Sequence, residues 1–165
     1  VYKRQTQDNS SSINQTLIEA CSRNDFLIID LGLIPKPAEA MTERRWQNSF
    51  SHWIFENADD LWLISTPHPV SAHSLHQFQT STTKQTLRAR VTFILNERAA
   101  GKRGDAQEEK FLTMVAPSHP HAIRVLPLDL RGAAAAEQDR SILVGSNPRG
   151  ALRRKFLECA TSLTI

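Results

Sequence analysis

The chain has 165 residues, of which 40% are hydrophobic and 22% are charged, and its net charge is +3. This balance fits one domain with a real core and excludes a chain too polar to fold. The sequence has neither an apolar run near the roughly 18 residues of a membrane span nor a signal-like start, so we expect a cytoplasmic protein. Cys21 and Cys159 lack a partner motif, and we expect both to be core thiols rather than a disulfide or zinc ligands.

The predicted elements alternate along the chain after a polar start. Residues 1–12 lack periodicity and are expected to be a disordered leader, or a foreign end, ahead of a domain at 13–165. In chain order the segments are a helix at 12–23, a strand at 26–32, a helix at 42–58, a strand at 61–66, a helix at 71–82, a strand at 90–97, a helix at 108–116, a strand at 122–129 and a closing helix at 149–163. The charged, glycine-bearing stretch 96–107 is predicted to be a surface loop. Strict alternation predicts a three-layer α/β/α domain with a mainly parallel sheet.

The predicted helix at 42–58 carries an aromatic stripe. Its members are Trp46, Phe50, Trp53, Ile54 and Phe55. Docking on the sheet is the favoured interpretation, because most such stripes form core. An oligomer or partner surface is the alternative, since Trp and Phe are enriched at interfaces.

Polar residues follow all four predicted strands. They are Asp30 with Gly32, Ser65 with Thr66, Asn96 with Arg98, and Pro127 with Asp129. In a parallel sheet these exits open on one edge, where α/β proteins bind ligands. An aspartate there can hold magnesium, and an asparagine offers the donor and the acceptor that an adenine edge needs. The set therefore predicts a nucleotide site.

These segments also resemble a known family. The stretches "DFLIIDLG", "NADDLWLISTPHPVSAHSL", "RVTFILNER" and "VLPLD" look like successive segments in the second half of ParA/MinD-type deviant Walker ATPases, closest to the pilus-assembly CpaE/TadZ branch. The resemblance runs from about residue 13 to residue 163 and implies an incomplete P-loop NTPase fold. It implies a role in protein localisation, pilus assembly or partitioning, with ATP and Mg²⁺ as cofactors and a homodimer, pilus-assembly proteins or polar-localisation proteins as partners.

The resemblance also implies roles for individual residues. Asp30 would lie near magnesium, directly or through water, and Gly32 near the γ-phosphate. Asn96 and Arg98 would lie near the base, with Pro127 and Asp129 beside it. Ordinary polarity at strand ends is the alternative explanation for all of these residues.

The sequence departs from the family at the phosphate-binding loop. No GxxxxGK[ST] pattern is present, and "GKRGD" at Gly101 follows a late strand instead of the first one. We therefore expect the chain to be the C-terminal part of a longer protein and not to hydrolyse ATP alone. A scaffold or dimerisation domain of the same fold is the alternative. A response-regulator receiver, with Asp30 as phosphoacceptor, is a distant alternative because the later strand ends in Asn96 where receivers have a lysine.

Two further patterns have competing interpretations. His68, His73 and His76 could suggest a metal site, but surface or capping histidines are favoured, and Ser71 is expected to cap the helix. The closing helix combines a basic first half with apolar positions at Leu152, Phe156, Cys159, Ala160 and Leu163. Docking on the sheet is favoured there over contact with a membrane or DNA.

Overall fold

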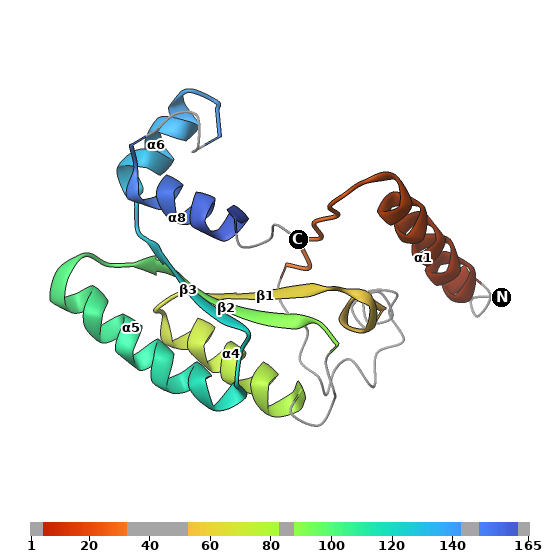
Figure 1. The fold of residues 1–165 in the computed structure, drawn as a ribbon, viewed down its shortest axis with the longest axis horizontal. Helices are drawn as coiled ribbons and strands as arrows, with labels where there is room; N and C mark the ends of the chain where they lie inside the picture. The colour runs from red at the N-terminus through yellow and green to blue at the C-terminus, as the bar shows by residue number, and fades with distance from the viewer. Residues whose placement is uncertain (1–4, 33–52, 83–87, 143–148, 162–165) are drawn as a thin grey trace. The chain divides into compact units, whose positions relative to one another are not determined.

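The computed structural model describes residues 5–32, 53–82, 88–142 and 149–161 (Figure 1). The chain divides into two compact units. The first unit comprises Val1–Leu61 and Gln77–Arg90, and the second comprises Trp62–His76 and Val91–Ile165.

Helices and strands alternate through most of the described chain. The helices are α1 (Gln5–Arg23), α4 (Pro69–Thr82), α5 (Gly101–Val115), α6 (Leu130–Gln138) and α8 (Ala151–Thr161), with a short 3₁₀ turn η1 (Ala116–Ser118). The strands are β1 (Asp60–Ser65), β2 (Arg90–Arg98) and β3 (Ala122–Pro127). Within these residues no helix combines the length and the apolar character that a transmembrane span requires.

The strands form an all-parallel sheet in the order β1-β2-β3, flanked by helices, which is the predicted α/β/α class. The β2–β3 register pairs Thr92 with Ala122 and Leu95 with Val125, and it shifts between Leu95 and Arg98. Since consecutive parallel strands need a crossover, α5 connects β2 to β3 and covers one face of the sheet (Figure 1).

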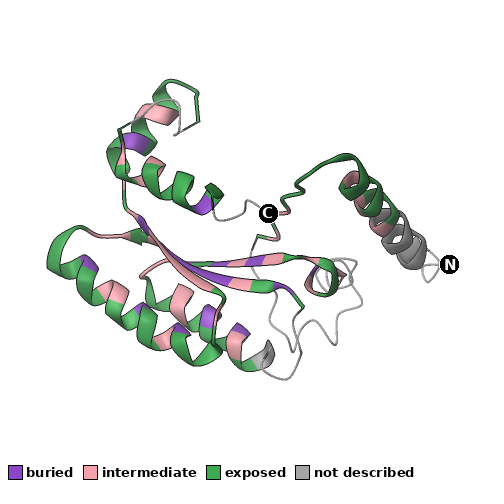
Figure 2. Ribbon diagram, viewed as in Figure 1, coloured by how far each residue is buried: buried purple, intermediate pink, exposed green. Residues whose placement is uncertain are grey.

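The core lies on both faces of the central strand. Phe93, Ile94 and Leu95 of β2 are each at most 2% exposed, so β2 is buried on both faces, as a helix-covered parallel strand should be. Figure 2 shows the buried residues concentrated along the strands and on the sides of the helices that meet them. On the α8 face, Ile94 packs with Leu126 and Cys159, and Trp62 and Leu152 contact this cluster.

Three sequence predictions are wrong in detail. Residues 26–32 do not form a strand, and Ile28 is 90% exposed, because no strand pairs with this segment among the described residues. Helix α1 begins at Gln5, so residues 5–12 are helical and not an irregular leader. Cys21 is exposed, whereas Cys159 is a core thiol as predicted.

The stretch predicted as a loop between β2 and its following helix is mostly helical. Helix α5 begins at Gly101, seven residues before the predicted start at Glu108. Helix α6 is absent from the predicted elements, although its four alanines have the highest helix propensity and Asp129 caps it.

The aromatic stripe lies partly outside the described residues. Trp46 and Phe50 fall there, whereas residues 53–57 are described and helical. Ile54 is buried, and the ring of Phe55 lies 5.8 Å from that of Phe78, both in the first unit. Ile54 and Phe55 are therefore packed within the first unit, Phe55 against Phe78 of α4, and docking of the stripe on the sheet itself stays a prediction.

Candidate functional site

Three of the four predicted strand exits meet at one edge of the sheet in the second unit. Arg98 and Pro127 are register partners at the ends of β2 and β3, and the Leu128 N–H donates to the Arg98 carbonyl at 2.9 Å. Ser65 ends β1, the neighbour of β2 in the same sheet. The convergence therefore holds for the exits of β1, β2 and β3.

The fourth exit is a turn. The Asp30 carboxylate accepts a 2.8 Å hydrogen bond from the Gly32 N–H, and Gly32 adopts φ +66°, which favours glycine. Both residues are exposed and belong to the first unit. Asp30 thus does not follow a strand, which removes the geometric argument for a phosphoacceptor or strand-end magnesium ligand.

The hydroxyl groups at the end of β1 stabilise the turn into α4. Ser65, 2% exposed, lies with its Oγ 3.1 Å from that of Ser71, and the Ser71 Oγ also accepts from the Thr66 N–H. The N-cap of α4 is His68 instead of Ser71. His68 directly precedes Pro69, the first residue of the helix, and its Nδ1 accepts a hydrogen bond from the Val70 N–H.

The other two histidines of the predicted group lie on α4. His73 and His76 are exposed on α4. In the part of the chain that the structure describes, no three His, Cys, Asp or Glu residues are grouped to hold a metal ion. The capping interpretation is therefore correct for His68.

Asn96 is the polar residue at this edge whose side chain is available to a ligand. It is half-buried after the buried Leu95. Its carboxamide offers both a donor and an acceptor, and no described residue bonds to it, so it is open to solvent or to a ligand. The next residue, Glu97, has φ 60°, a left-handed conformation that is unfavourable for any residue with a side chain. Such strain clusters at functional sites.

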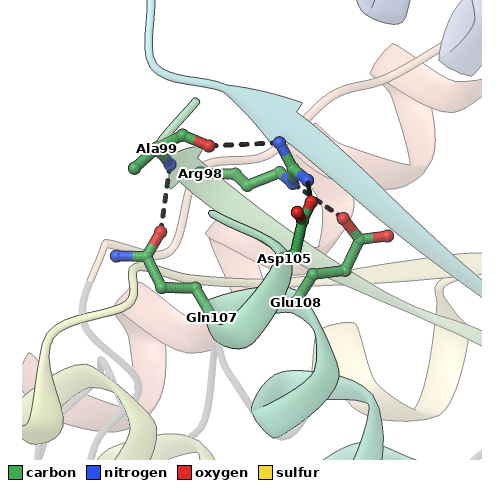
Figure 3. Close-up of polar contacts among 5 residues, drawn as sticks. All are labelled: Arg98, Ala99, Asp105, Gln107 and Glu108. Carbon is green, nitrogen blue, oxygen red and sulfur yellow. Dashed lines mark hydrogen bonds and ion pairs between the residues drawn. The ribbon is translucent and has the colours of Figure 1, made fainter. Parts of the chain in front are cut away.

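Arg98 is held by its own chain (Figure 3). Its Nε donates to Glu108 Oε2 at 2.7 Å and its Nη2 donates to Asp105 Oδ1 at 2.5 Å. Its Nη1 donates to the Ala99 carbonyl at 3.1 Å, and the Ala99 N–H donates to the side chain of Gln107. The Arg98 side chain, 23% exposed, therefore ties the end of β2 to the first turns of α5.

This cluster does not follow from the predicted elements, because Asp105 and Gln107 fall in the predicted loop and Glu108 lies at its border. The i, i+3 spacing of Asp105 and Glu108, which places both acids on one face of a helix, is the signal that could have found them. Gly104 belongs to the same junction, because a Cβ there would lie 1.8 Å from the Ala99 carbonyl oxygen.

Asp129 is a helix cap. Its Oδ1 accepts from the Gly132 N–H at 2.8 Å, and its carbonyl accepts from the Ala133 N–H at 3.0 Å. Pro127 and Asp129 thus define the turn from β3 into α6.

The hydroxyl groups at this edge are engaged within the chain. The hydroxyl of Ser65 bonds Ser71 and the backbone, and no histidine or carboxylate among the described residues bonds it as an activating base would. Away from this edge, burial raises the pKa of the Cys159 thiol, although the Arg124 guanidinium acts in the opposite direction. A half-buried amide beside a strained turn is what the edge offers a ligand.

No protein-family model matches this sequence, and no curated protein matches it significantly.

Proposed function

We propose that the chain forms the base side of the nucleotide site of a ParA/MinD-type ATPase, nearest the CpaE/TadZ branch. Its role would be protein localisation, pilus assembly or partitioning in the cytoplasm, as a homodimer or with pilus-assembly proteins. Asn96 would bind the adenine edge, with Pro127 and Asp129 shaping the wall beside it. The assignments of Asp30 to Mg²⁺ and of Gly32 to the γ-phosphate rest on the resemblance alone.

The carboxamide of Asn96, which no described residue engages, carries this proposal. Among the described residues no buried side-chain polar atom lacks a hydrogen-bond partner, so the half-buried Asn96 amide is open to water or to a ligand. The edge at which Asn96 lies is the one where α/β sheets bind ligands. The left-handed Glu97 beside it adds a second feature that is common at binding sites.

Nucleotide titration of the Asn96→Ala variant tests the proposal. We expect wild type to bind ATP weakly, and Asn96→Ala to weaken that binding by about five- to tenfold through lost base hydrogen bonds. Gln138→Ala, which removes an exposed amide from α6, is the matched control and should bind as wild type does. Equal ATP affinity in wild type and Asn96→Ala would remove Asn96 from the site.

A non-catalytic scaffold is the second candidate. The contacts of Ser65, Arg98 and Asp129 within the chain favour it, because polar groups that stabilise turns need no ligand to explain them. A scaffold should show no saturable ATP binding, and sedimentation should give the same oligomeric state with and without ATP. Saturable binding together with the predicted Asn96→Ala loss favours the nucleotide site instead.

A further inference from the structure

Arg98 is fixed through both its side chain and its backbone. The side chain bonds Glu108 and Asp105 of α5, and the backbone carbonyl accepts from the Leu128 N–H after β3. Three elements therefore meet at this one residue. Two acids three residues apart on a helix suit the forked guanidinium, which presents several donors in one plane.

Glu97 directly precedes Arg98 at the end of β2. Its left-handed backbone, φ 60°, persists only where the surroundings determine it. The β2–β3 register also shifts between Leu95 and Arg98, so the ladder does not impose the backbone conformation at these positions. The hydrogen bonds of Arg98 to α5 therefore fix the chain on the C-terminal side of Glu97.

We infer that Arg98 is a positioning residue, which acts through the Glu97 turn to direct the Asn96 carboxamide and does not itself bind the ligand. The inference rests on the proposed nucleotide site for the identity of that ligand. It differs from the role that the sequence resemblance implied, since Arg98 is directed to α5 instead of to the base. Its consequence is specificity: Arg98 sets the preference for adenine over guanine through the placement of Asn96.

Four single variants separate this role from a general effect on stability. Arg98→Lys keeps the charge and loses the fork, and Glu108→Gln removes the acid that accepts from Nε. Arg103→Lys and Glu109→Gln make the same chemical changes at exposed positions of α5 and serve as controls. Thermal melts identify any variant that fails to fold, and Glu108→Gln provides the test if Arg98→Lys does.

ATP and GTP affinities are then measured by NMR titration. Both test variants should lower ATP affinity by about fivefold while GTP affinity changes little, and the controls should match wild type. The double variant Arg98→Lys/Glu108→Gln should bind ATP no more weakly than either single variant, because both changes break the same hydrogen bond between Arg98 and Glu108. In an Asn96→Ala background, Arg98→Lys should have no further effect. An additive loss in that background would show that Arg98 touches the ligand, and an unchanged ATP-to-GTP ratio would also overturn the inference.

The ligand-free protein provides an independent readout. The side-chain amide signals of Asn96 and the backbone amide signal of Glu97 should move in Arg98→Lys and Glu108→Gln but not in the controls. If wild type binds neither nucleotide, the proposed function is wrong, and these signals alone decide the inference. If the Asn96 and Glu97 amide signals do not move in Arg98→Lys and Glu108→Gln, Arg98 does not position Asn96, whichever ligand the site binds.

Discussion

Gly104 shows how closely α5 approaches the end of β2. It is buried in the first turns of the helix, and an added Cβ would lie 1.8 Å from the Ala99 carbonyl oxygen and 2.9 Å from Arg98 Nη1. Real Cβ atoms do not tolerate such distances, and the nearest obstacle is backbone, which cannot move aside as a side chain can. The absence of a side chain at this position therefore permits the Arg98 junction.

Replacing Gly104 by Ala tests this packing, because helix propensity and the collision predict opposite changes in the free energy of unfolding. Helix propensity alone predicts a gain of about 1 kcal/mol for Gly→Ala inside a helix. The collision predicts a loss in the free energy of unfolding of about 1–3 kcal/mol, as for overpacked sites. Urea denaturation measures the difference, and a variant more stable than wild type would contradict the packing.

Gly101→Ala provides the comparison at a second glycine. Gly101 has φ +65°, and no atom lies within 4 Å of the position that an added Cβ would take, so only its left-handed backbone opposes the change. The expected loss in the free energy of unfolding is about 1–2 kcal/mol. Unlike Gly104→Ala, it should leave the Asn96 and Glu97 amide signals in place.

Single residues can be predicted only unevenly from the sequence. The exits after β1, β2 and β3 could be placed at one edge, because alternating elements determine where parallel strands end. The role of Arg98 could not, since its partners Asp105 and Glu108 come from a stretch whose glycines resemble a loop. Tertiary contact overrides local propensity there.

At the scale of elements, α8 shows how the chain closes one face of the sheet. Cys159 is 4% exposed against Ile94 and Leu126, whereas Phe156 is 41% exposed. Docking is therefore confirmed for Cys159 and for Leu152, which contacts the same cluster. Phe156 and Ala160 of the predicted stripe are exposed, and Leu163 lies outside the described residues. Lys155 pairs with Glu158 at 2.6 Å on the exposed side, an ion pair that contributes little to stability.

Truncation before Arg149 should destabilise the domain. Removing α8 uncovers the apolar cluster around Ile94, and we expect the melting temperature to fall by at least about 5 °C. Arg154→Gln combined with Lys155→Gln removes exposed charges and the weak Lys155–Glu158 ion pair, and it should melt close to wild type. An unchanged melt after truncation, together with lost pelleting on anionic liposomes, would show that α8 is a membrane helix.

Elements can be predicted where the pattern matches the environment that the fold supplies. β2 is apolar on both faces and becomes the central strand. The segment 26–32 has a similar pattern without a paired neighbour among the described residues, and apolar composition alone does not make a strand. Helix α6 has few apolar side chains and thus weak periodicity, although its alanines and its Asp129 cap are visible in the sequence.

At the scale of the whole molecule, the alternation of elements is sufficient to predict the α/β/α class. It does not reveal the division into two units, because Trp62–His76 and Gln77–Arg90 are contiguous in sequence yet belong to different units. Asp30 lies in the first unit and Asn96 in the second. Sequence order therefore does not establish that a metal ligand and a base ligand serve one nucleotide.

The chain by itself should bind ATP weakly and not turn it over. The proposed site gives the base a contact with Asn96, but the sequence contains no glycine-lysine loop whose amides and ammonium group could hold the phosphates. A phosphate-release assay with Mg²⁺ should give background rates for wild type, and Asp30→Ala should be indistinguishable from it. Asp25→Ala, which removes another exposed carboxylate of the same unit, is the matched control. Magnesium-dependent turnover that Asp30→Ala abolishes and Asp25→Ala retains would contradict this expectation, because it would place Asp30 at a working metal site.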